Sequence, residues 1–130
     1  MNQERERIGT GTPWEAIAGY SRAVRDGDRI WVSGTTATDA AGKVVGGTAG
    51  DQARACLRNI EDALTWLDAG LEDVVRTRMF VTNAADWEAV ARVHGEVFRD
   101  IRPASTLVIV TALVDPAMLV EIEVEAVVRR

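Results

Sequence analysis

The chain has 130 residues, of which 47% are hydrophobic and 27% are charged, and its net charge is −5. These values describe an ordinary globular protein that is long enough to bury a core, so we expect one domain over residues 1–130. The acidic balance and the single lysine, Lys43, argue against nucleic acids and against anionic membrane surfaces as partners, because both require clustered cations.

Targeting segments and metal sites are not expected either. No apolar run approaches the roughly 20 residues that span a bilayer, and residues 1–7 are polar, unlike a signal peptide. Cys56 is the only cysteine, so it cannot form an internal disulfide, which suits a reducing cytoplasm. One histidine and one cysteine offer no metal-ligand spacing, so we expect no metal.

In the first third of the chain, the pattern predicts a β-hairpin. Asp26-Gly27 is a turn signal, and the strand Arg29–Gly34 follows it with Ile30 and Val32 on one face. A second turn is predicted over residues 39–43.

The clearest element is a helix that starts after Thr48. Thr48 and Asp51 resemble a capping box, and Gly70 supplies an expected stop. Its apolar stripe consists of Leu57, Ile60, Leu64 and Leu67.

A strand over Val74–Thr82 and a second helix over about 85–98 come next. Asn83 is a candidate cap for this helix. Its expected inward stripe consists of Trp87, Val90, His94 and Val97.

The C-terminal part predicts two strands joined by an Asp-Pro turn, and the last strand alternates strictly. Glu121, Glu123 and Glu125 share one of its faces. Three like charges so close together require hydration, cationic partners or a functional role. Arg76 and Arg78 have the matching two-residue spacing, so we predict that the two strands are neighbours with Glu123 and Glu125 paired to these arginines. The order strands–helix–strand–helix–strands indicates an α+β fold of split-βαβ type.

Five segments occur in an order and spacing that resemble the reactive-intermediate deaminase (RidA or YjgF-like) family. They are Gly19–Val24, Val32–Thr35, Val74–Thr82, Pro103-Ala104 and Val120–Glu123. The resemblance implies a chorismate-mutase-like fold: a six-stranded mixed sheet with two helices on one face, assembled as a homotrimer around a central barrel. It also implies pockets at the subunit interfaces that hydrolyse enamines or imines to a 2-oxo acid and ammonia, without a cofactor.

Several site residues of the family can be carried over by position. The family tyrosine matches Tyr20, the serine–glycine pair matches Ser33 and Gly34, next to Thr35, and the water-positioning glutamate matches Glu121.

The family arginine that clamps the substrate carboxylate is absent. Its position is Ser105, followed by Thr106, and a pocket-facing asparagine on the second helix is replaced by Ala91. A serine cannot supply the charge or the fork of an arginine, so the resemblance points to a subgroup with altered specificity. Arg102 could reach a neighbouring pocket only from the preceding loop.

Each candidate site residue could instead have a purely structural role. Glu121 could position water or pair with a cation inside the barrel, and His94 could move a proton or pack in the core. Tyr20 and Ser33 could bind ligand or pack at a seam, and the hydroxyls of residues 105 and 106 could bind ligand or cap the start of the strand. Gly34 allows a close backbone approach, while Cys56 reads as a small buried hydrophobe.

Two functions remain open at this stage. The first is a cofactor-free hydrolase for a small imine, enamine or related metabolite. The alternative is a non-catalytic trimer that binds a small ligand or a protein. A ribonuclease or translation inhibitor fits poorly, because the chain is acidic and has no basic patch.

Overall fold

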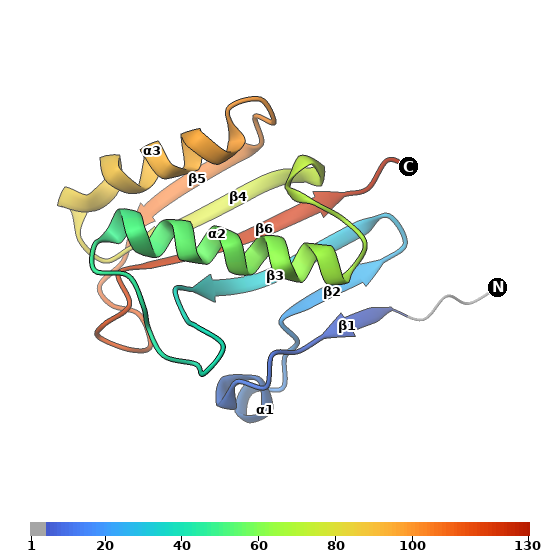
Figure 1. The fold of residues 1–130 in the computed structure, drawn as a ribbon, viewed down its shortest axis with the longest axis horizontal. Coiled ribbons are helices and arrows are strands. Elements are labelled where there is room, and N and C mark those ends of the chain that lie inside the picture. Colours follow the sequence, from blue (N-terminus) through green and yellow to red (C-terminus); the bar gives the residue numbers. More distant parts are fainter. Residues whose placement is uncertain (1–4) are drawn as a thin grey trace.

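A computed structural model describes residues 5–130, and within this range six strands form one mixed sheet in the order β1-β2-β3-β6-β4-β5 (Figure 1). The strands are β1 (Glu6–Ile8), β2 (Ala23–Asp26), β3 (Arg29–Thr36), β4 (Val74–Val81), β5 (Ala104–Ile109) and β6 (Val120–Val127). The helices are α1 (Pro13–Ala18), α2 (Ala49–Trp66) and α3 (Trp87–Phe98), with short 3₁₀ turns at Leu71–Asp73 (η1) and Ala84–Asp86 (η2). The predicted α+β fold with a six-stranded mixed sheet is confirmed. The first four residues of the polar N-terminal segment lie outside the described range.

The last strand enters the middle of the sheet. β6 pairs antiparallel with β3 on one side and with β4 on the other, while β4 and β5 are parallel. Its alternate residues, Val120 to Ala126, are buried against the helices. The intervening glutamates therefore point to the other side of the sheet.

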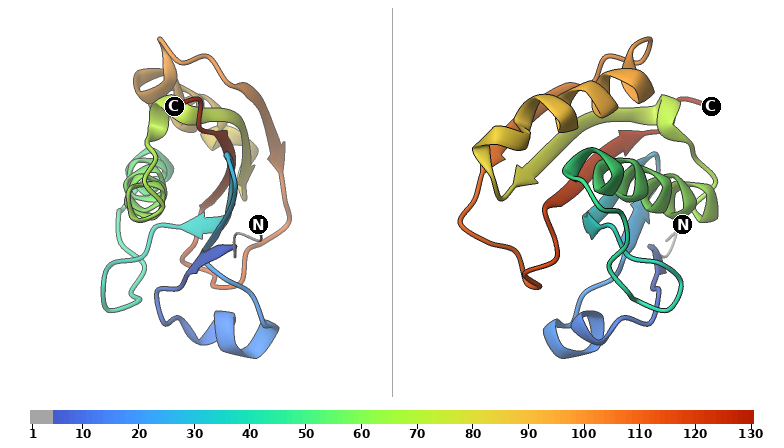
Figure 2. Two further views of the ribbon diagram at one scale, coloured as in Figure 1. Left: turned by 90° about the vertical axis from the view of Figure 1, so that its right-hand side faces the viewer. Right: turned by 60° about the vertical axis from the view of Figure 1, so that its left-hand side comes forward.

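Both long helices cover the same face of the sheet. Figure 2 shows α2 and α3 on one side of the curved sheet, with the other face bare and α1 beyond the end near β1 and β2. We call the side without helices the open face. The expected pair of helices on one face is thus confirmed.

Cross-strand ion pairs occupy the open face between β4 and β6. Arg78 Nη1 lies 3.3 Å from Glu123 Oε2, and Arg76 Nε lies 3.7 Å from Glu125 Oε2. Arg78 opposes Glu123 in the register of the two strands. The predicted adjacency and pairing are confirmed.

The start and the buried stripe of α2 also match the prediction, but its end does not. Thr48 Oγ1 accepts from the Asp51 amide at 3.1 Å, as expected of a cap. The helix stops at Trp66, before the expected Gly70, because Asp68 adopts the left-handed conformation with φ 63°. Aspartate tolerates this conformation because its short polar side chain can bond locally.

On α3 the predicted buried face is partly wrong. Trp87 is the first residue of the helix and is 54% exposed, whereas Val90, Val93 and Phe98 are buried. The residues that precede Trp87 form the 3₁₀ turn η2, in which Asn83 Oδ1 accepts from the Ala85 amide at 3.0 Å. The tighter turn shifts the start of the α-helix, so the stripe begins one turn later.

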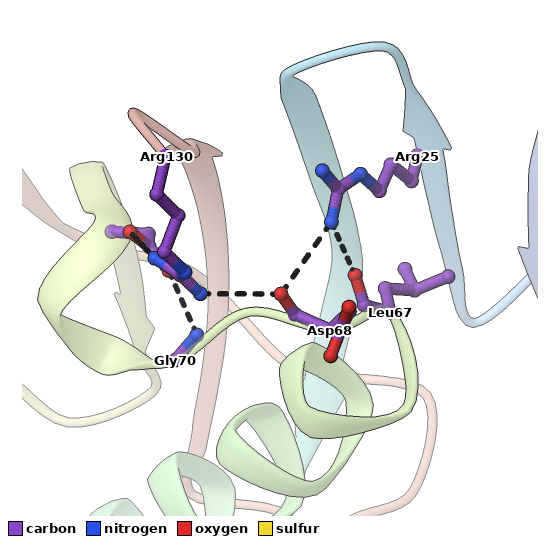
Figure 3. Close-up of polar contacts among 6 residues, drawn as sticks. Arg25, Leu67, Asp68, Gly70 and Arg130 are labelled. Atoms are coloured by element: carbon purple, nitrogen blue, oxygen red, sulfur yellow. Dashed lines mark hydrogen bonds and ion pairs between the residues drawn. The ribbon is translucent and has the colours of Figure 1, made fainter.

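The turn between α2 and β4 is held by a side chain from β2 and by another from the segment after β6 (Figure 3). Arg25 of β2 donates to the Leu67 carbonyl at 2.7 Å, and Arg130 donates to the Asp68 carbonyl at 3.2 Å. Arg130 also donates to the buried Asp73 at 2.8 Å, and Asp73 accepts from the Gly70 amide at 2.9 Å. These contacts anchor the C-terminal end to the helix layer.

Candidate functional site

Glu121 lies on the open face, where an irregularity in β3 makes room for it. The register between β3 and β6 shifts between Val32 and Thr35, so Ser33 and Gly34 form a β-bulge. A Cβ placed on Gly34 would lie only 2.8 Å from Cδ of Glu121. The carboxyl group of Glu121 therefore rests directly on the Gly34 backbone, and any larger residue at position 34 would displace it.

Arg22 lies near this carboxyl group, and Tyr20 lies next to Arg22. Arg22 Nη2 donates to the Gly34 carbonyl at 2.5 Å, and the guanidinium carbon lies 5.8 Å from the centre of the Tyr20 ring. Tyr20 follows the short helix α1, which ends at Gly19 with φ 74°. The end of α1 thus delivers a tyrosine and an arginine to the bulge.

The environment of Glu121 disfavours its charge. Loss of hydration raises the pKa of the Glu121 carboxyl above its ordinary value of 4.5. The positive charge of Arg22 opposes this shift, and the negative charge of Glu123 adds to it. Such a carboxyl group can exchange a proton more readily than an ordinary surface glutamate.

The hydroxyls of the bulge are engaged within the protein. Ser33 Oγ donates to the Ser21 carbonyl at 2.7 Å, and Thr35 Oγ1 donates to the Ser33 carbonyl at 2.8 Å. Thr35 is buried, whereas Ser33 is half-buried. Both hydroxyls therefore fix the conformation on which Glu121 depends.

Ser105 belongs to a second polar group, formed with Thr77 and His94. Thr77 Oγ1 donates to Ser105 Oγ at 2.7 Å, and the same oxygen lies 2.8 Å from His94 Nε2. The ring nitrogen of His94 donates to Thr77 in one tautomer and accepts from it in the other. Ser105 is exposed on β5, so its hydroxyl group can also contact a ligand.

His94 also lines a hollow of about 300 Å³ at the C-terminal end of α3. The other lining residues are Gly95, Phe98, Arg99, Arg102 and Pro103. Burial lowers the pKa of His94 below its ordinary value of 6.5, so the ring is neutral at pH 7. Arg102 Nε donates to the Arg99 carbonyl at 2.8 Å, which holds this side chain near the hollow.

The two polar groups lie on opposite faces of the sheet. Thr77 is fully buried under α3 and pairs with Ser105 in register, whereas Glu121 pairs with Phe80 on the open face. Thr106 opposes Arg78, which places it on the Glu121 side, and Ala91 is half-buried on α3. One chain therefore does not bring all the predicted site residues into one pocket.

Arg22 is the residue whose role the sequence did not indicate. It was visible in the segment Gly19–Val24, but nothing in the spacing tied it to Glu121, which lies 99 positions later. Its position follows from strand pairing, since the Ser33 amide donates to the Arg22 carbonyl at 3.0 Å. The missing family arginine was the one available hint that another cation could matter.

Other chemistries have little support in the described residues. Burial raises the pKa of the Cys56 thiol to about 12, and the thiol faces the Val120 carbonyl, so it is not a nucleophile at neutral pH. Across residues 5–130, no three His, Cys, Asp or Glu side chains gather closely enough to hold a metal ion. No helix in the same range is long and apolar enough to cross a membrane.

Comparison with known proteins places this chain in a family. The sequence model described as endoribonuclease L-PSP matches residues 10–128. Protein SCO2049 of Streptomyces coelicolor is 38% identical over 120 residues, covering 92% of this chain and 90% of that protein. The crystal structure of Rv2704 from Mycobacterium tuberculosis, a YjgF/YER057c/UK114 family member, superposes with a TM-score of 0.88 at 44% identity, covering 96% of this chain and 100% of that one. YyfA of Yersinia pestis, from the Rid protein family, gives a TM-score of 0.84 at 30% identity, with 96% and 100% coverage. The chain belongs to the endoribonuclease L-PSP family, also known as the YjgF/RidA family.

Proposed function

We propose that this protein is a cofactor-free hydrolase of small imines or enamines, with Glu121 as the base that positions and deprotonates water. The observation that carries the proposal is the setting of Glu121: a carboxyl group with a raised pKa that rests on Gly34 and lies near Arg22, which in turn lies next to the Tyr20 ring. A general base works best when its pKa approaches the working pH. Burial moves the pKa of Glu121 in that direction.

The proposed reaction needs only one water molecule and one proton carrier. The substrate binds with its imine nitrogen already protonated. Glu121 takes a proton from water as the oxygen bonds to the iminium carbon, and the electron pair of the C=N π bond becomes the lone pair on nitrogen. Glu121 then gives the same proton to the nitrogen of the carbinolamine, and ammonia leaves as the C–N bond breaks. The hydroxyl proton then goes to solvent, and a carbonyl compound remains.

The complete site would form between two copies of the chain. Ser105 and Glu121 face opposite sides of the sheet in one chain, so one substrate can touch both groups only if a second copy contributes one of them. The homotrimer with a central barrel that the family resemblance implies would bring them together. Bare apolar side chains on the sheet support such an assembly; they are Trp31, Val75, Val108 and Ile109.

An RNA substrate has less support from the arrangement of charges. The arginines of β4 on the open face, Arg76 and Arg78, are both paired with glutamates of β6. They therefore offer no free cationic stripe to phosphates.

A single buried thiol, Cys56, suits a reducing compartment, and we place the protein in the cytoplasm.

The proposal can be tested by coupling the purified protein to a dehydratase that releases 2-aminoacrylate. We expect faster formation of pyruvate and ammonia in the presence of the protein. Glu121→Gln should lose most of the acceleration, about 100-fold or more, the usual size of a general-base contribution. Glu125→Gln is the matched control, because Glu125 lies on the same strand and face but pairs with Arg76.

The outcome with Ser105→Arg separates two failures. No acceleration by the natural sequence, but clear acceleration by Ser105→Arg, would show an intact base with a different natural substrate. No acceleration by any variant would reject the hydrolase and favour a trimer that only binds a ligand.

A further inference from the structure

Arg22 is held at the candidate site without a carboxylate partner. Arg76 and Arg78 on the same face each have a glutamate oxygen within 4 Å, but among residues 5–130 no acidic oxygen lies that close to Arg22. Its Nε is buried and has no hydrogen-bond partner in the same range. A buried N–H group of a guanidinium is costly to leave unpaired, so the fold holds this side chain in place at an energetic cost. The donor left for a ligand is Nη1, which is not buried and forms no hydrogen bond among residues 5–130.

The neighbours of Arg22 hold the side chain in place without neutralising it. The Gly34 carbonyl takes one of its five N–H groups, and the Tyr20 ring lies 5.8 Å from the guanidinium carbon. The charge of Arg22 reaches Glu121, because it offsets part of the rise that burial causes in the pKa of this carboxyl group. The two side chains nevertheless form no ion pair. The arrangement thus keeps a positive charge near the proposed base.

We propose that Arg22 binds the carboxylate of an anionic substrate, and so takes over at a new position the task of the arginine that Ser105 replaces. This inference rests on the proposed function, in which the family resemblance already implies a 2-imino acid as the substrate; what it adds is the residue that binds the carboxylate. In such a molecule the carboxylate is bonded to the carbon that water attacks. Its anchor must therefore lie next to the base, as Arg22 does next to Glu121.

Arg102 is a weaker candidate for the same task. It lines the hollow beside His94 on the helix side of the sheet, and its Nε already donates to the Arg99 carbonyl. Within one chain the sheet separates it from Glu121, so of these two arginines only Arg22 lies next to the base without a second copy.

Binding of a stable product analogue tests the inference without turnover. The probes are pyruvate and its neutral analogue pyruvamide, titrated calorimetrically into the intact oligomer at pH 7. We expect Arg22→Gln to weaken pyruvate binding about ten- to a hundredfold, as the loss of a charge-assisted hydrogen bond predicts, and pyruvamide binding by less than threefold. Arg22→Lys keeps the positive charge but loses the paired N–H donors of the guanidinium, so its pyruvate affinity should lie between those of the natural protein and Arg22→Gln.

Arg78→Gln is the matched control, since it removes an arginine on the same face that is already paired with Glu123. It should leave both affinities unchanged. Unchanged pyruvate binding in Arg22→Gln, equal losses for both probes, or no pyruvate binding by the natural sequence would each overturn the inference. If the protein binds pyruvate through Arg22 but releases no ammonia from imines, only the hydrolase proposal is rejected. If the protein hydrolyses imines but Arg22→Gln leaves its pyruvate affinity unchanged, only this inference is rejected.

Discussion

Glu121 is held where its own charge is unfavourable. A carboxylate that only stabilised the fold would be expected to have a close cation, as Glu123 and Glu125 do. Glu121 instead rests on a glycine, and burial raises its pKa despite the nearby charge of Arg22. A carboxylate kept in a partly buried position that disfavours its charge is a candidate for catalysis or binding, because strongly perturbed pKa values cluster at functional sites.

This cost predicts that Glu121→Gln stabilises the protein at neutral pH. The folded state has the higher pKa, so the folded protein is most stable relative to the unfolded chain when Glu121 is protonated. That stability is present below the ordinary value of 4.5 and is lost as the pH rises through the folded-state pKa. Glutamine resembles the protonated form at every pH, so the midpoint of thermal unfolding should be higher for Glu121→Gln at pH 7, with the difference vanishing near pH 4.

Calorimetric unfolding from pH 4 to pH 8 provides the measurement, and Glu125→Gln provides the comparison. Glu125→Gln removes a cross-strand ion pair and should not raise stability at pH 7. A Glu121→Gln protein that is less stable than the natural sequence at pH 7 would show that the charge of Glu121 supports the fold.

His94 predicts the opposite dependence on pH. Burial lowers its pKa in the folded state, so the unfolded chain takes up the proton first as the pH falls below 6.5. The contribution of neutral His94 is therefore present above pH 6.5 and is lost on acidification. His94 is the only histidine, so no other imidazole titrates in this range. Urea unfolding of the natural protein should show stability falling between pH 7 and pH 5 more steeply than in His94→Gln; parallel curves would contradict the assignment.

At the scale of elements, the β-bulge in β3 couples the fold to the site. Gly34→Ala would place a methyl group 2.8 Å from Cδ of Glu121, so the carboxyl group must move. We expect the fold to persist and imine hydrolysis to fall at least tenfold, since a displacement of about 1 Å can cost a hundredfold in rate. The assay is pyruvate release, with circular dichroism to verify the fold.

Gly47→Ala is the control for the same chemical change. A Cβ on Gly47, in the loop before α2, would meet no atom within 4 Å, and alanine restricts the unfolded chain more than glycine does. This variant should be at least as stable and equally active. Equal activity in Gly34→Ala would show that the bulge does not position Glu121.

Strong periodic patterns predicted most of the elements correctly. The alternation in β6 and the apolar stripe of α2 reflect burial on one face, which a sequence records directly. The N-terminal elements were missed, because β1 has three residues and α1 has six, too short for a period to show. Thr12-Pro13 was the available signal, since proline is favoured at the first position of a helix.

The site was less predictable than the fold. Glu121 and Gly34 could be identified from the family resemblance, and their contact follows from the register of β3 with β6. The bulge that brings them together leaves no mark in the sequence beyond Ser33-Gly34. The separation of Ser105 from Glu121 depends on which face each strand residue occupies, and this required the pairing of β4 with both neighbours.

At the scale of the whole molecule, the side of the sheet that carries the candidate base is also the side that lacks a cover. The two long helices cover one face and leave the other bare (Figure 2). On the bare face Trp31 and Val108 are each 42% exposed. β5 is the edge strand next to β4, and an exposed edge with apolar side chains invites pairing or packing with another chain. These features favour an oligomer in which the sheets face one another.

Val108→Lys should therefore disrupt assembly and activity together. Light scattering of the natural protein should give about three times the chain mass of 14.1 kDa, and the lysine variant should shift toward a single chain. A charge buried in an apolar interface costs several kcal/mol, which is enough to dissociate a moderately stable oligomer. Because Ser105 and Glu121 can meet one substrate only across two copies, the rate of imine hydrolysis should fall as the fraction of oligomer falls.

Trp66→Lys is the control, since Trp66 is 60% exposed at the end of α2 in the helix layer, and this variant should remain assembled and active. A fully active single chain in Val108→Lys would mean that each copy holds a complete site, contrary to the geometry of the sheet.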